Sequence, residues 1–131
     1  MFAPRKKIHA SSQQNAYYLK PGKNFEGMFW FDGFGNAQDR DYSGHWYRIK
    51  LSAGKEEKLQ CWTNRYLPHD EESLRFVYSD NTRITSVRRK RIVKNGKNYV
   101  QYRFTAAVSG WGYVFIGNPS HYEKMYSIMV M

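Results

Sequence analysis

The strongest local signal in this sequence is an Asn-Gly pair, Asn95-Gly96, that separates two stretches of alternating side chains. Both residues tolerate the positive φ of a type I′ turn, which joins antiparallel strands in a tight hairpin. The pattern therefore predicts a hairpin of residues 87–93 and 98–104, with Lys94 opposite Lys97. The register that follows pairs Ile92 with Tyr99, Lys90 with Gln101 and Arg88 with Arg103.

Alternation along the two strands sorts the hairpin side chains onto two faces. One face is largely apolar: Val87, Val93, Val100, Tyr102 and Phe104, with Arg89 and Arg91 among them. The other face gathers cations around Ile92 and Tyr99: Arg88, Lys90, Lys94, Lys97 and Arg103. Like charges directly across a ladder repel. This face therefore predicts a negatively charged partner, unless the cations splay into water or meet the acidic stretch Asp70, Glu71 and Glu72.

The rest of the chain predicts more short strands and no amphipathic helix of three turns. Strand-like runs broken by turn residues cover 25–31, 44–51, 58–63, 74–78, 111–116 and 125–131. Aromatic residues make up 18% of the chain, and they fit pleated sheets better than helices. We expect an all-β, antiparallel sandwich or jelly-roll-like single domain at 25–131, preceded by a basic and polar arm at 1–24. A small barrel like an oligonucleotide-binding fold is the alternative.

Charge is the main asymmetry of the composition. Lys and Arg number 21 against 11 Asp and Glu, which gives a net charge of +10. Most of the excess falls between Arg83 and Tyr122, where the chain carries no acid. Neither a membrane-spanning run nor a secretory signal is visible, and the one cysteine, Cys61, has no partner for a disulfide. We therefore expect intracellular production, without a membrane and with a polyanionic partner.

Two sets of residues are candidates for binding. The candidates for contact with a polyanion are Arg5, Lys6, Lys7, Arg83, Arg88, Lys90, Lys94, Lys97 and Arg103. The candidates for stacking on bases are Tyr99, Trp62 and Trp46, because each stands close to a basic residue. Since aromatic residues also supply most of the core, many of them must be structural instead.

No pattern predicts catalysis. The histidines at 9, 45, 69 and 121 are dispersed, and Cys61 lies inside a strand-like run where a lone thiol is usually inert packing. Oxygen side chains gather at Asp32, Asn36, Asp39 and Asp41, but their spacing does not match a calcium loop. We therefore expect no enzyme activity, no cofactor and no metal.

Three functions remain open from the residues. The leading hypothesis is a non-enzymatic structural or accessory subunit of a larger assembly, such as a virus or phage particle, that docks through the basic hairpin. Its arm and residues 125–131 would then bury apolar area against other protein subunits. The first alternative is a β-barrel protein that binds single-stranded nucleic acid, and the second is a carbohydrate-binding module that stacks Trp rings on sugars.

Overall fold

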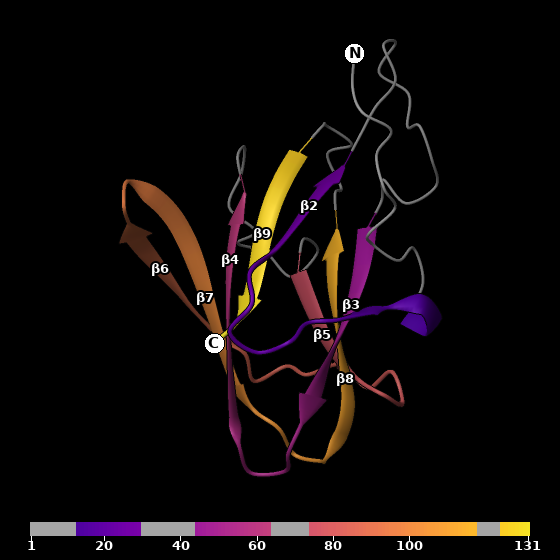
Figure 1. Cartoon of the computed structure of the whole chain (residues 1–131). Helices are drawn as coiled ribbons and strands as arrows, with labels where there is room; N and C mark the ends of the chain where they lie inside the picture. Colours follow the sequence, from indigo (N-terminus) through magenta and orange to yellow (C-terminus); the bar gives the residue numbers. More distant parts are fainter. Residues whose placement is uncertain (1–12, 30–43, 64–73, 118–123) are drawn as a thin grey trace.

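The computed structural model describes residues 13–29, 44–63, 74–117 and 124–131, which form two β-sheets packed face to face (Figure 1). The four-stranded sheet has the order β1 (Tyr17–Tyr18), β3 (Gly44–Leu51), β8 (Gly110–Gly117), β5 (Leu74–Tyr78). The five-stranded sheet has the order β2 (Phe25–Phe29), β9 (Lys124–Val130), β4 (Glu56–Thr63), β7 (Lys97–Thr105), β6 (Arg88–Lys94). The predicted sandwich is confirmed, and two distinct sheets take the place of the alternative closed barrel.

The order of the strands is jelly-roll-like. Along the chain, β2 to β5 alternate between the two sheets, and the last strand, β9, lies beside the first long strand, β2. Each strand pair is antiparallel except β1 and β3, which run parallel. A chain that crosses between sheets in this way covers both apolar faces with its own strands.

Alternation explains which side of each strand faces the core. In β3, Tyr47 and Ile49 are buried, whereas Trp46 and Arg48, which alternate with them, are half-buried on the outer side. β4 repeats the pattern with Leu59 and Cys61 inside. The core between the sheets is rich in aromatic residues, and Phe76 packs against both Tyr102 and Phe104 at ring separations of 5.6 and 5.2 Å.

The two ends of the described chain join the sandwich. Within residues 13–24, a 3-10 turn at Gln13–Asn15 precedes β1, and Leu19 is buried in the core. Residues 125–131 were expected to cover a neighbouring subunit, but β9 lies between β2 and β4. Its Tyr126, Ile128 and Val130 are therefore buried by other strands of the same chain. Across the described ranges, we find no helix of the length and apolarity that a bilayer crossing requires.

Candidate functional site

The β6–β7 hairpin has the predicted turn and the predicted register. Asn95 and Gly96 have φ values of 53° and 76°, as a type I′ turn requires. The ladder pairs Arg88 with Arg103, Lys90 with Gln101, Ile92 with Tyr99 and Lys94 with Lys97. The predicted register is therefore confirmed, and residues directly opposite each other share a face. The other side of the hairpin is apolar on β7 only, because Arg89, Arg91 and Val93 of β6 are all exposed.

The hairpin continues onto β4 to make one open surface, which we name the hairpin face. β4 pairs with β7 so that Lys58 lies opposite Arg103, and Gln60 lies opposite Gln101. The hairpin face comprises the outward side chains of three strands: Glu56, Lys58, Gln60 and Trp62 of β4; Lys97, Tyr99, Gln101 and Arg103 of β7; Arg88, Lys90, Ile92 and Lys94 of β6. Cations thus dominate this surface. It spans three strands, of which the hairpin supplies only β6 and β7.

An acid that the sequence did not reveal stabilises one end of this face. Oε2 of Glu56 lies 3.3 Å from Nη2 of Arg88 and 3.3 Å from Nη2 of Arg103. The carboxylate therefore relieves the repulsion between the two opposed arginines. The acidic stretch 70–72, named as a possible counter-charge, lies outside the described residues. No local pattern could identify Glu56, because its position depends on the distant pairing of β4 with β7.

Apolar side chains cross the middle of the hairpin face. Ile92 and Tyr99 are half-buried partners in the ladder. The β4–β7 register, continued by one residue, places Trp62 beside Tyr99. Lys97 lies over Trp62, with its Nζ 4.8 Å from the ring centroid. The two side chains therefore make a cation–π contact on this face. Of the predicted stacking residues, Tyr99 and Trp62 are brought together here.

The outer strand of the hairpin contributes little to the core. Every residue of β6 is exposed except Ile92, which is half-buried. Figure 1 shows the turn end of the hairpin bending away from the four-stranded sheet. Since β6 lies at the edge of its sheet, its charges remain accessible on both faces, and they also discourage pairing with another edge strand.

Other predicted site residues lie elsewhere. Arg83 forms a bridge with Val77 at the edge of the four-stranded sheet, away from the hairpin face. Trp46 is on the outer side of the four-stranded sheet, so it shares no surface with Trp62 and Tyr99. Arg5, Lys6 and Lys7 fall outside the described residues.

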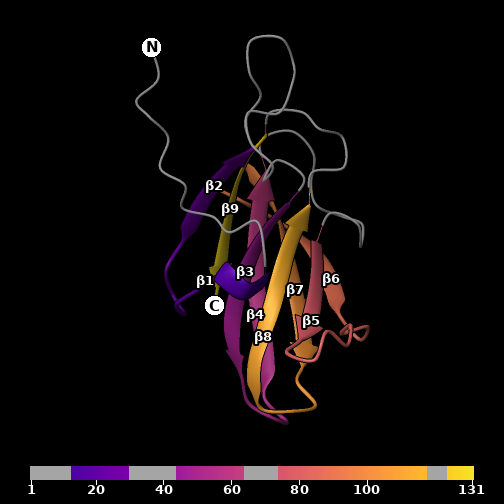
Figure 2. The same cartoon turned by 90° about the vertical axis from the view of Figure 1, so that its right-hand side faces the viewer.

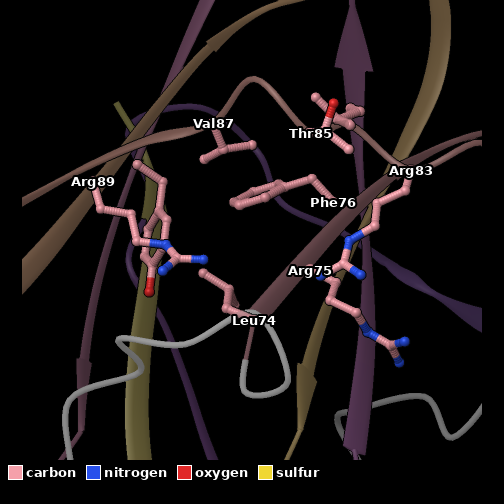
Figure 3. A pocket seen from close by; sticks show the side chains of 9 residues that line it. Leu74, Arg75, Phe76, Arg83, Thr85, Val87 and Arg89 are labelled. Atoms are coloured by element: carbon pink, nitrogen blue, oxygen red, sulfur yellow. The ribbon is translucent and has the colours of Figure 1, made fainter.

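A cleft opens between the edges of the two sheets, but it is very small. Leu74, Phe76 and Val87 line it, with Arg89 on one side of the apolar side chains and Arg83 on the other (Figure 3). Its volume is about 10 Å³, which is room for about one water molecule. The cleft therefore does not accommodate a substrate or a cofactor.

A buried hydrogen-bond network links three polar side chains. The hydroxyl of Tyr126 hydrogen-bonds to His45 Nδ1 at 2.6 Å and to the hydroxyl of Tyr47, with all three residues buried. Burial raises the pKa of Tyr126 and of Tyr47, so both remain neutral. Cys61 is fully buried, as expected of an inert thiol. Among the described residues, no group of His, Cys, Asp and Glu could hold a metal ion.

Comparison with known proteins identifies the fold and no family. Neither a family model nor a curated protein sequence matches the chain. The solved structures similar to it include the pre-peptidase C-terminal domain of a collagenase from Bacillus anthracis, with a TM-score of 0.52 and 9% sequence identity. That likeness covers 88% of this chain and 94% of the collagenase domain. At this level of identity it supports the β-sandwich architecture alone.

Proposed function

We propose that this protein is a non-catalytic structural or accessory subunit of a larger assembly, and that its hairpin face binds the nucleic acid packaged there. The observation that carries this proposal is the clustering of cations from β4, β6 and β7 on one open sheet face. A surface of this charge attracts phosphates and releases their counterions, whatever the base sequence. Glu56 neutralises one end and leaves the lysines near the turn for the ligand.

A virus or phage particle is the setting that we propose for this subunit. The support is the jelly-roll-like strand order, because viral capsid domains use such folds. This support is an analogy at the level of the fold, so the binding chemistry of the hairpin face carries the larger part of the proposal.

A second candidate function is the binding of free single-stranded nucleic acid. The row of Ile92, Tyr99 and Trp62 favours it, because aromatic rings between cations are the usual platform for unpaired bases. A carbohydrate-binding role has less support. The cations of the hairpin face favour a ligand that carries phosphates over a neutral sugar, and Arg48 covers the ring of Trp111.

The proposal is tested by titrating a fluorescently labelled poly(dT) oligonucleotide at several salt concentrations. The variant with Lys90→Ala and Lys94→Ala should bind more weakly, and its salt slope should fall by about 1.4, since each phosphate contact contributes about 0.7 for a single strand. The control variant, with Arg91→Ala and Lys23→Ala, loses equal charge away from the hairpin face and should bind like the wild type.

Two further variants separate the two candidate functions. If phosphate attraction alone holds the strand, Tyr99→Ala and Trp62→Ala should change the affinity less than twofold. If the rings stack on bases, each substitution should cost about 1–3 kcal/mol of binding free energy. An oligonucleotide affinity that is absent, or that does not respond to salt, would contradict both.

A further inference from the structure

The outer side of the four-stranded sheet is a second cationic surface, with a different chemistry from the hairpin face. Figure 2 shows β8 between β3 and β5 on this side of the molecule. We name it the arginine–aromatic face, and it comprises Tyr18 of β1; Trp46, Arg48 and Lys50 of β3; Trp111, Tyr113 and Phe115 of β8; Arg75 and Val77 of β5. None of these four described strands contains an acidic residue.

Trp111 supports two cations at one end of this face. The guanidinium carbon of Arg48 lies 4.4 Å from the ring centroid of Trp111, and Nζ of Lys50 lies 5.6 Å from it. The ring of Tyr18 meets the indole edge-on, with 5.6 Å between centroids. A hollow of about 400 Å³ opens beside this cluster and is lined by Lys50, Leu51, Ser52, Gly110 and Trp111.

Phe115 forms a similar cluster at the other end. The guanidinium carbon of Arg75 lies 4.6 Å from the ring centroid of Phe115, and the ring of Trp46 packs against the same phenyl group at 4.9 Å. The ladder explains the arrangement, because Phe115 pairs with Trp46 on one side and with Arg75 on the other.

Stacking on a ring fixes the orientation of the two half-buried arginines. Nε of Arg48 and Nε of Arg75 are buried, so a ligand that arrives from solvent would meet their terminal N–H groups. A guanidinium group that stacks on a ring is held in orientation while its fork of N–H donors stays available to a carboxylate or phosphate. Arg48 pairs with Tyr113 and Arg75 with Phe115, so the two residues are offset along β8 as well as across it, and their Cα atoms are about 12 Å apart.

The composition of this face favours a protein as its occupant. Protein–protein interfaces are enriched in Trp, Tyr, Phe and Arg and depleted in Lys, and this face carries Lys50 as its one lysine within the described strands. The arginines cover the rings of Trp111 and Phe115, so these rings support cations and are poorly placed to stack on bases.

We propose that the arginine–aromatic face docks an acidic segment of a partner protein, whose carboxylates bind Arg48 and Arg75. Charge complementarity carries the choice of partner, because the described strands of this face carry Arg48, Lys50 and Arg75 and no acidic residue. This docking surface lies on the opposite side of the sandwich from the hairpin face, so it does not depend on what the hairpin face binds.

The test uses a fluorescein-labelled oligoglutamate peptide and measures its anisotropy with the folded chain. In one variant Arg48→Lys and Arg75→Lys keep the net charge but remove the planar forks, and we expect affinity to fall at least tenfold. The hairpin variant with Lys90→Ala and Lys94→Ala should change this affinity less than twofold. Unchanged binding by the Arg→Lys variant, or a large loss in the hairpin variant, would overturn the proposal.

A measurement on the unaltered protein keeps the proposal testable if the arginine variant fails to fold. The indole N–H signals of Trp46 and Trp111 should shift in NMR spectra as oligoglutamate is added, whereas that of Trp62 should not. Shifts confined to Trp62 would assign the peptide to the hairpin face and refute the proposal. A concentration-dependent dimer of the chain alone, abolished by the Arg→Lys variant, would refute it in favour of self-association through this face.

Discussion

Tyr126 joins the two sheets through one hydroxyl group. It lies on β9 of the five-stranded sheet, and its partners His45 and Tyr47 lie on β3 of the four-stranded sheet. Its ring occupies the space that a side chain at Gly27 would need, since an added Cβ would come within 2.3 Å of it. The buried network therefore requires a glycine at position 27 of the neighbouring strand β2.

Replacing Tyr126→Phe should destabilise the protein more than replacing Tyr47→Phe. The first change removes a hydroxyl that two buried groups share, and the loss of a buried hydrogen-bond partner costs about 1–3 kcal/mol. The second change removes an end of the network and leaves the bond between Tyr126 and His45. Urea unfolding measures both variants, and equal losses would contradict the central role of Tyr126.

The same residue contributes to the response of stability to alkaline pH. Burial raises the pKa of Tyr126 well above its ordinary value of 10.0, so above that pH the unfolded chain loses its proton first. The contribution to stability is therefore complete below pH 10.0 and declines as pH rises further. Tyr126→Phe should show a shallower decline in the same urea experiments carried out between neutral and alkaline pH.

At the scale of the strand, the hairpin depends on its turn more than on its packing. β6 has no buried side chain, so the ladder to β7 and the Asn95-Gly96 turn hold it in place. Gly96 has a φ of 76°, and an added Cβ would meet nothing within 4 Å. A substitution there therefore acts through the backbone conformation alone.

Gly96→Ala should loosen β6 while the sandwich stays folded. The positive φ costs an alanine about 1–2 kcal/mol, and hydrogen exchange should become faster at the amides of β6 and its partners on β7. Gly54→Ala is the matched control, since Gly54 has a φ of 82° and equally open surroundings in the β3–β4 turn. If both variants accelerate exchange in β6 equally, the turn does not specifically hold the hairpin.

The elements that alternation and turn chemistry define could be predicted from the sequence. The hairpin register and the strands at 44–51 and 74–78 follow from a period of two bounded by turn residues. The two-residue strand β1 has no such pattern, and it forms because Leu19 enters the core beside β3. Local alternation says which side of a strand is buried and not which sheet it joins, so neither the position of Glu56 nor the separation of Trp46 from Trp62 could be predicted.

At the scale of the whole molecule, the sandwich places two cationic faces back to back. Sheets pack about 10 Å apart, and the outward side chains add to that separation. At physiological salt the Debye length is about 8 Å, so charges bound on one face are largely screened from those on the other. Part of the net charge of +10 is thus divided between two surfaces that can act independently.

This separation predicts that an oligonucleotide and an acidic peptide bind the same molecule together. With oligoglutamate at saturation, the dissociation constant of poly(dT) should change less than twofold at physiological salt, because the peptide occupies the arginine–aromatic face and the strand occupies the hairpin face. Analytical ultracentrifugation with two labels should detect a complex that contains both ligands. Because lowering the salt lengthens the screening distance, it should make the two anions compete slightly. If poly(dT) instead displaces the peptide mole for mole at every salt concentration, a single face must bind both, and the two sides of the sandwich do not act as separate sites.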